Sequence, residues 1–225
     1  MKRILVPTDF SEQAENALKV AAQLAKKNES EIYVLNSLEL PTHLSSSGAN
    51  GAMPESLFFI KLAEKYFEEL LEKPYLEGLL IHEAIIGHGE VYKDVNEVVK
   101  EKNIDLVIMG SQGTNGFMEL FIGSNTEKVV RTSKIPVLVI KNNHEDFKTD
   151  NFVYATDFSE ECKIPFNQAK KFAEGTNTHI NLLYINTPSE FKTTKEINTK
   201  IRSFIRDMDD SNFSVHIYND ISIEK

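Results

Sequence analysis

The stretch Ile4-Leu-Val-Pro-Thr-Asp-Phe-Ser-Glu12 decides the fold, because the chain contains it twice. It returns as Phe152-Val-Tyr-Ala-Thr-Asp-Phe-Ser-Glu160, with Thr-Asp-Phe-Ser-Glu identical in both copies and 148 positions between them. Each copy precedes a helical pattern and then a second apolar run, at 31–35 and at 179–185. The shared succession predicts two homologous strand–helix–strand units.

Strands and helices go on alternating in the first unit. After the second strand we expect a polar loop at 37–54, a helix at 57–71 ended by Pro74, a strand at 79–86, a helix at 91–102, a strand at 105–109, a loop at 111–122, a helix at 124–132 and a strand at 136–140. Continuous apolar runs at 106–109 and 137–140 are typical of parallel strands buried on both faces. The sequence therefore predicts an α/β fold, an open parallel five-stranded sheet with helices on both faces, Rossmann-like.

The second unit repeats only the opening of this pattern. After 185 there is a helical stretch at 196–208 and a strand at 213–218. The residues between the units, 141–150, are polar and charged, which indicates a linker. We expect a first domain at 1–142 and a partial second copy at 150–225.

Composition narrows the classes of function. The 225 residues carry 25 basic and 34 acidic side chains, a net charge of −9, and this acidity argues against nucleic acid as a partner. One cysteine excludes a disulfide framework within the chain and favours a reducing compartment. Neither a signal peptide nor an apolar run of about 18 residues is visible, so we expect a cytoplasmic protein without membrane contact.

A glycine pattern follows the strand at 105–109. Gly110 and Gly113 are followed, after nine residues, by Gly123 and Ser124 at the start of a helix. Glycines permit close backbone approach, and the N–H groups of such turns and of a helix N-terminus converge on anions. With hydroxyl groups at Ser124 and Thr126, the segment predicts a phosphate site that needs no lysine. The alternative is structural: the glycines only end a strand and begin a helix, and Ser124 is the helix N-cap.

Pro7, Thr8 and Asp9 end the first strand, and ligands of open α/β sheets bind at the carboxyl ends of strands. Both segments are therefore expected to line one crevice. Asp9 also has a structural interpretation, as a turn aspartate before a helix capped by Ser11. Asp157 repeats it without a glycine loop, which favours that interpretation.

These segments, together with Ile135-Pro-Val-Leu-Val-Ile140, resemble the universal stress protein family. The ATP-binding branch of that family has the pattern Gly, two residues, Gly, nine residues, Gly-Ser/Thr, which this chain matches at every fixed position. The resemblance covers the whole first unit and, more weakly, the second. It implies an adenine nucleotide alpha hydrolase-like fold, in which a tandem pair resembles the family's dimer fused into one chain.

The resemblance also implies roles for individual residues. Pro7, Thr8 and Asp9 would contact the adenosine, Ser37 the adenine through its backbone, Met109 and Gly110 the ribose, and Gly113, Gly123, Ser124 and Asn125 the phosphates. The implied ligand is ATP, with ADP or AMP as alternatives and Mg²⁺ as a candidate bridging ion. We expect one nucleotide site per chain, because the second unit lacks the glycine loop. The implied assembly is a homodimer, paired through the strand at 136–140, or an intrachain pseudo-dimer.

Signatures of catalysis are missing from the sequence. It has no Gly-x4-Gly-Lys-Ser/Thr loop, no His-Glu-x-x-His and no Gly-x-Ser-x-Gly, so we assign no catalytic and no metal-ligating residue. Asp9 is the only carboxylate expected near the phosphates. The leading hypothesis is a stress-response protein that binds ATP and acts as a nucleotide-dependent regulatory or interaction protein. The alternatives are an interaction module of the same fold without nucleotide, and an enzyme such as a slow ATPase or an adenylyl transferase.

Overall fold

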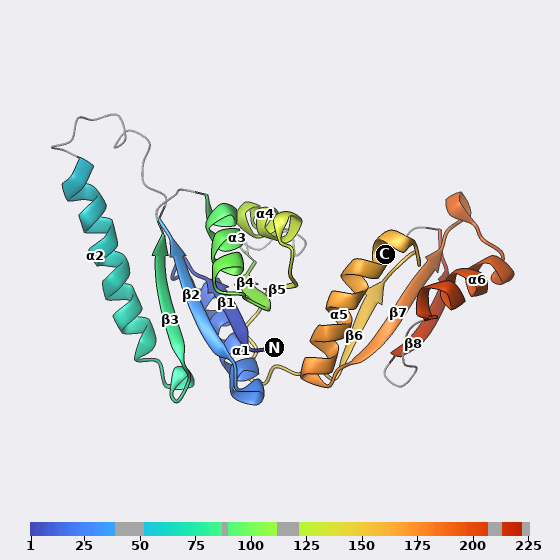
Figure 1. Cartoon of the computed structure of the whole chain (residues 1–225), viewed down its shortest axis with the longest axis horizontal. Coiled ribbons are helices and arrows are strands. Elements are labelled where there is room, and N and C mark those ends of the chain that lie inside the picture. The colour runs from blue at the N-terminus through green and yellow to red at the C-terminus, as the bar shows by residue number, and fades with distance from the viewer. Residues whose placement is uncertain (39–51, 87–89, 112–121, 207–212, 222–225) are drawn as a thin grey trace. The chain divides into compact units, whose positions relative to one another are not determined.

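The computed structural model describes residues 1–38, 52–86, 90–111, 122–206 and 213–221. The chain divides into two compact units, Met1–Phe147 and Lys148–Lys225 (Figure 1). None of the described helices is long and apolar enough to cross a membrane.

The first unit contains one sheet of five parallel strands in the order β3-β2-β1-β4-β5. Its elements are β1 (Arg3–Pro7), α1 (Glu12–Asn28), β2 (Glu31–Ser37), α2 (Ala52–Leu71), a 3-10 helix (Pro74–Leu76), β3 (Ile81–Ile86), α3 (Val91–Glu101), β4 (Leu106–Gly110), α4 (Ser124–Thr132) and β5 (Val137–Ile140). The predicted α/β fold is confirmed. The strand order turns between β1 and β4, and a crevice forms there at the carboxyl ends of the strands.

Helix α1 begins where the sequence predicts. The Ser11 hydroxyl accepts a hydrogen bond from the Ala14 N–H (3.3 Å), and Glu12 and Glu15 lie in the first turn, where the helix dipole favours acidic groups. The buried stripe of the helix is rich in alanine, which lets the helix backbone approach the sheet closely. Its buried residues include Ala14, Ala17, Ala21, Ala22 and Ala25.

Helices α3 and α4 pack against one face of this sheet. Leu5 of β1 and Leu35 of β2 are buried there with Val95 and Val98 of α3 and Val129 of α4. The valines of α3 recur at helical spacing, so a single apolar stripe of the helix covers the sheet.

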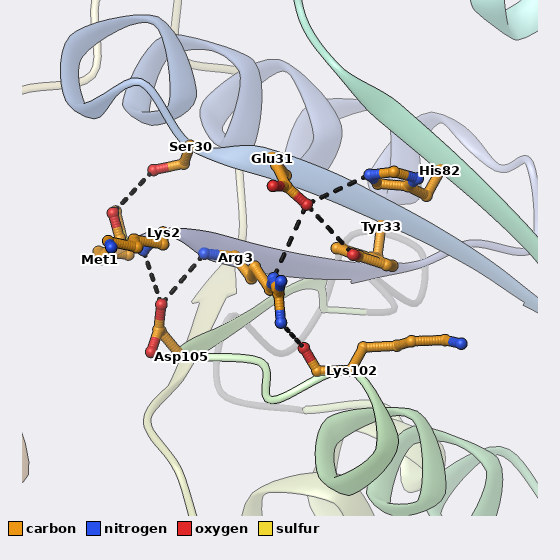
Figure 2. A network of polar contacts seen from close by, with 9 residues as sticks. All are labelled: Met1, Lys2, Arg3, Ser30, Glu31, Tyr33, His82, Lys102 and Asp105. Atoms are coloured by element: carbon orange, nitrogen blue, oxygen red, sulfur yellow. Dashed lines mark hydrogen bonds and ion pairs between the residues drawn. The ribbon is translucent and has the colours of Figure 1, made fainter.

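A polar network links the amino ends of neighbouring strands, and the crevice lies at the other end of the strands (Figure 2). Glu31 Oε2 contacts His82 Nε2 at 3.2 Å and Arg3 Nε at 3.7 Å, which links β2 to β3 and β1. Asp105 Oδ2 accepts hydrogen bonds from the backbone N–H groups of Lys2 (2.6 Å) and Arg3 (3.1 Å). The network fixes the segment before β4 beside β1.

The second unit has a smaller parallel sheet, β6-β7-β8. Its elements are β6 (Asn151–Ala155), a 3-10 helix (Glu160–Cys162), α5 (Lys163–Thr176), β7 (His179–Asn186), a 3-10 helix (Pro188–Glu190), α6 (Thr194–Ile205) and β8 (Phe213–Asn219). Helix α6 begins earlier than predicted because Thr193 and Glu196 form a capping box. The last residues of the predicted helix, 207–208, lie outside the described residues.

Part of the predicted linker is attached to the first unit. The Gln23 side chain of α1 donates to the His144 carbonyl (2.9 Å) and accepts from the Phe147 N–H (2.7 Å). The chain is therefore held against α1 as far as residue 147, close to where the second unit begins.

Candidate functional site

A pocket of about 400 Å³ lies at the carboxyl ends of β1, β2 and β4. It is lined by Pro7, Thr8, Asp9, Ser11, Gln13, Ala14, Leu35, Ser37, Leu38, Val91, Met109, Gly110, Gly123, Asn125 and Thr126. The two segments that the sequence placed at one crevice do meet there.

The turn after β1 is closed by its own side chains. Thr8 Oγ1 accepts a hydrogen bond from the Phe10 N–H (3.0 Å), and Asp9 Oδ1 accepts one from the Ser11 N–H (3.0 Å). Phe10 has a φ of 61°, the left-handed region that such a turn requires. Asp9 is thus a turn aspartate as well as a lining residue, and one of its oxygens already accepts a hydrogen bond.

The second copy of the motif builds the same turn. Thr156 Oγ1 accepts from the Phe158 N–H (2.9 Å), Asp157 Oδ1 accepts from the Ser159 N–H (2.9 Å), and Phe158 has a φ of 58°. The identity of Thr-Asp-Phe-Ser in both units is therefore explained by backbone geometry, because both units need these residues to form the same turn. The identity does not require a ligand site in either unit.

Two hydrogen bonds hold the Thr8 backbone to β2. The Thr8 N–H donates to the Leu35 carbonyl (2.8 Å), and Asn36 Nδ2 donates to the Thr8 carbonyl (2.9 Å). Asn36 is a buried positioning residue that no motif in the sequence indicated. It fixes the height of the turn above the sheet.

Ser37 lies beside a buried carboxylate. Its hydroxyl donates a short hydrogen bond to Asp94 Oδ2, and Asp94, in the first turn of α3, is completely buried. This contact joins β2 to α3 next to Val91, which lines the pocket. The sequence did not indicate Asp94, because one acidic residue in a helical pattern is usually a solvent-facing charge.

Gly110 is required by packing. A Cβ at this position would lie 2.5 Å from the Gln13 carbonyl oxygen, so only glycine lets β4 end against the first turn of α1. The Gly110 carbonyl accepts a hydrogen bond from the Thr126 hydroxyl (2.9 Å). Thr126 is buried, and its hydroxyl, which we expected to face a phosphate, joins α4 to the end of β4.

Helix α4 begins without a side-chain cap. Gly123 occupies the N-cap position with a φ of −57°, and Ser124 is the first helical residue, so the structural interpretation of Ser124 as N-cap is wrong. Ser124 is exposed and does not line the pocket, whereas Asn125 does. With no capping side chain, N–H groups of the first turn remain available to a ligand.

The pocket thus holds most of the predicted site residues. Those that line it are Pro7, Thr8, Asp9, Ser37, Met109, Gly110, Gly123 and Asn125. Gly113 lies outside the described residues. Gln13, Ala14 and Val91 also line the pocket and were not predicted. They could have been, because they lie in the first turns of helices that follow the strands of the sheet.

Charge in the pocket comes mainly from backbone dipoles. Among the described lining residues, Asp9 is the only one with an acidic side chain, and none is lysine, arginine or histidine. The first turns of α1 and α4 both border the cavity, each with the positive end of a helix dipole. Within the described residues, no three His, Cys, Asp or Glu side chains are grouped so as to hold a metal ion. The arrangement favours binding of an anionic ligand through backbone N–H groups.

Comparison of sequences finds relatives of the first unit. Residues 1–141 match the sequence model of the Universal stress protein family. The universal stress protein MJ0577 of Methanocaldococcus jannaschii is 34% identical over an alignment of 159 positions, which covers 64% of this chain and 96% of that protein. The universal stress protein YxiE of Bacillus subtilis is 29% identical over an alignment of 147 positions, which covers 62% of this chain and 98% of that protein.

Comparison of structures gives matching folds. The solved structure of MJ0577 has a TM-score of 0.52 at 27% identity and covers 64% of this chain and 98% of its own. A universal stress protein from Archaeoglobus fulgidus has a TM-score of 0.68 at 21% identity, over 97% of this chain and 78% of its own. The second likeness concerns the fold alone and extends over both units.

Proposed function

The chain belongs to the universal stress protein family, and on that premise we propose that its first unit binds ATP in the pocket at the carboxyl ends of β1, β2 and β4. One observation carries the proposal: the first turns of α1 and α4 converge on the same cavity. Helix N-termini bind phosphate through unpaired N–H groups and the helix dipole, without a lysine. A cavity of about 400 Å³ is also within the usual size of small-molecule sites.

The lining residues suggest the orientation of the nucleotide. In this proposal the adenosine lies against Pro7, Thr8, Asp9 and Ser37, the ribose near Met109 and Gly110, and the phosphates toward Gly123, Asn125 and the first turn of α4, which begins at Ser124. A phosphate contact of Gly113, which lies outside the described residues, stays a prediction. ADP and AMP would bind in the same way with fewer contacts to α4. The order of affinity then follows the number of phosphates.

Mg²⁺ would accompany the triphosphate. Because Asp9 is the only acidic side chain of the described lining, the ion would be held chiefly by phosphate oxygens and water, as Mg²⁺ usually is in nucleotide sites. Its role would be to lower the charge of the ligand beside an acidic protein.

We propose binding rather than turnover as the activity. Hydrolysis needs a base that positions water and cations that stabilise the transition state. Here one Asp9 oxygen already accepts the Ser11 N–H, and the described lining has no lysine or arginine. Bound nucleotide would then regulate how the protein associates with itself or with a partner in the stress response.

Thermal unfolding and calorimetric titration of the full chain with ATP, ADP and AMP, with and without Mg²⁺, test the proposal. We expect ATP to raise the melting temperature most, because a ligand of the native state stabilises it, and one site per chain. No shift with any nucleotide, or two sites per chain, would contradict it.

A pair of variants tests where the phosphates bind. Asn125→Asp adds a negative charge at the start of α4 and should weaken ATP binding by about tenfold, or ~1.4 kcal/mol, and AMP binding less. Asn143→Asp makes the same change at an exposed residue that does not line the pocket and should leave both affinities unchanged. Equal effects of the two substitutions on ATP binding would show that α4 does not contact the phosphates.

A further inference from the structure

The apolar part of the pocket lies on the sheet face that α3 and α4 cover. Leu35, near the end of β2, and Met109, near the end of β4, line the pocket and belong to the buried cluster beneath these helices. Val91, in the first turn of α3, packs against that cluster and also lines the pocket. This part of the cavity therefore suits a flat apolar group, such as the base of the proposed nucleotide.

Ser37 adds a polar group to this apolar part. Residues of a strand alternate between the two faces of a sheet, so Ser37 lies on the same face as Leu35, two residues earlier. Ser37 is partly exposed and lines the pocket, whereas its partner Asp94 is completely buried and does not line it. A ligand would thus meet Ser37, and Asp94 can act on the ligand only through Ser37.

The hydrogen bond between the two residues fixes the direction of the Ser37 hydroxyl. A serine hydroxyl has one hydrogen to donate and two lone pairs that accept, whereas a carboxylate only accepts. The Ser37 O–H donates to Asp94 Oδ2, and Asp94 lies in the first turn of α3, where the helix dipole favours a negative charge. Since its hydrogen is used inside the protein, the Ser37 oxygen offers only lone pairs to the pocket.

The turn after β1, which borders the same cavity, has also used several of its donors. The Thr8 N–H donates to the Leu35 carbonyl, the Phe10 N–H to Thr8 Oγ1, and the Ser11 N–H to Asp9 Oδ1. The Asp9 carboxylate keeps further lone pairs. The ends of β1 and β2 therefore present acceptors to a ligand, and a ligand group that donates hydrogen bonds fits there best.

We propose that Asp94 determines which base the pocket accepts, because it holds the Ser37 oxygen as an acceptor. The inference rests on the proposed function and adds a determinant of base choice to it. Adenine carries an amino group at position 6, which can donate to the Ser37 oxygen. Hypoxanthine and guanine carry a carbonyl there, so that two acceptors would face each other. Asp94 does not touch the ligand and is a positioning residue.

Two facing acceptors cost binding energy because neither regains the hydrogen bond that it made with water. A site built to pair with an N–H group rejects an analogue that lacks this group far more strongly than an apolar pocket rejects a misfit of shape. The selectivity should therefore appear as a ratio of affinities, whereas a contact that only holds β2 to α3 would change the affinities for all nucleotides together.

Calorimetric titration of the full chain with ATP and with inosine triphosphate (ITP) tests the inference. ITP keeps the ribose and the triphosphate but has a carbonyl in place of the amino group at position 6, with a hydrogen on the adjacent ring nitrogen. We expect the wild type to bind ATP about tenfold or more tightly than ITP. Ser37→Ala removes the oxygen that reads the base, and should lower this ratio about fivefold or more.

Asp94→Asn tests the positioning role with a side chain of the same shape. The amide can donate to the Ser37 oxygen, which leaves the Ser37 O–H free to donate to the carbonyl of ITP, so the preference for ATP should shrink. Asp105→Asn is the matched control, since the Asp105 carboxylate also joins distant segments, by accepting from the Lys2 and Arg3 N–H groups at the amino ends of the strands. Whatever its effect on stability, this variant should keep the ratio of the wild type.

Each contrary outcome has its own meaning. Equal affinities of the wild type for ATP and ITP would overturn the inference and leave the proposed function standing, whereas no binding of either nucleotide would overturn both. An unchanged ratio in Ser37→Ala would show that this oxygen does not face the base, and that variant decides the question even if Asp94→Asn fails to fold. Equal losses for both nucleotides in a folded Asp94→Asn variant would reduce Asp94 to a structural contact.

Discussion

The hydroxyl of Thr126, in the first turn of α4, donates a 2.9 Å hydrogen bond to the carbonyl oxygen of Gly110 at the end of β4. The bond joins the two ends of the glycine segment across the pocket, with one partner in a buried side chain and the other in the backbone. Since the phosphates are proposed to bind at α4, this contact positions the helix that would receive them.

Replacing Thr126 with valine should therefore affect both stability and binding. Thr126→Val keeps the shape but leaves the Gly110 carbonyl without this donor, which should lower the free energy of unfolding by ~1–2 kcal/mol and reduce the thermal shift given by ATP. Thr199→Val removes an exposed hydroxyl that donates to the Lys195 carbonyl in α6, and should change stability by less than about 0.5 kcal/mol. Urea unfolding measures both. Equal losses would show that the buried bond contributes nothing special.

Gly110→Ala should destabilise the first unit even in the absence of nucleotide. The added Cβ would lie 2.5 Å from the Gln13 carbonyl oxygen, so β4 and α1 must separate, at a cost of ~1–3 kcal/mol. Gly78→Ala meets no atom within 4 Å and carries only the strain of a φ of +77°, which makes it a comparison for a conformational cost alone. Thermal unfolding without ligand decides the question: a Gly110→Ala variant as stable as wild type would contradict the packing role.

The sheet and most of the pocket lining were readable in the sequence for a physical reason. A parallel strand that is buried on both faces has a continuous apolar sequence. The residues that line the crevice lie at the ends of such runs, as Pro7 and Met109 do. Contacts between segments distant in sequence have no such signature. In the sequence, Asp94 resembles any solvent-facing acidic residue of a helix, and only the folded chain brings it into contact with Ser37. Gly110 resembles part of a ligand-binding loop, and only the fold shows that α1 packs against it.

The carboxyl group of Asp157 should make the second unit sensitive to acid. The backbone N–H of Ser159 is the largest cause that holds the pKa of Asp157 below its ordinary value of 3.8, with help from the Ser159 hydroxyl, the Cys162 thiol and the Lys200 charge. A carboxyl whose pKa is lowered by folding contributes stability above its ordinary pKa and loses it as the pH falls through the lowered value.

Asp157→Asn should therefore destabilise the protein near neutral pH, with the difference from wild type shrinking as the pH falls below 3.8. Glu161→Gln makes the same change of charge at a neighbouring exposed residue and should show no such trend. Urea unfolding at several pH values gives the difference. An NMR titration of the carboxyl carbon reports the pKa directly, and a value at or above 3.8 would refute the argument.

Tyr154 should respond to base in the opposite sense. Burial is the main cause that raises its pKa to about 12, and the Cys162 and Asp157 charges add to it. The hydroxyl donates to the Cys162 carbonyl (3.1 Å), and the ring packs edge-on against Phe166, at 5.1 Å between centroids. Because folding raises this pKa, the neutral phenol contributes its full stability below the ordinary pKa of 10.0, and that contribution is lost as the pH rises toward 12.

Absorbance at 295 nm should thus show an ionisation step near pH 12. Tyr154→Phe should reduce this step, and the step should move toward pH 10.0 when the wild type is unfolded in guanidinium. If Tyr154→Phe leaves that step unchanged, burial of the Tyr154 hydroxyl is not the cause of a raised pKa.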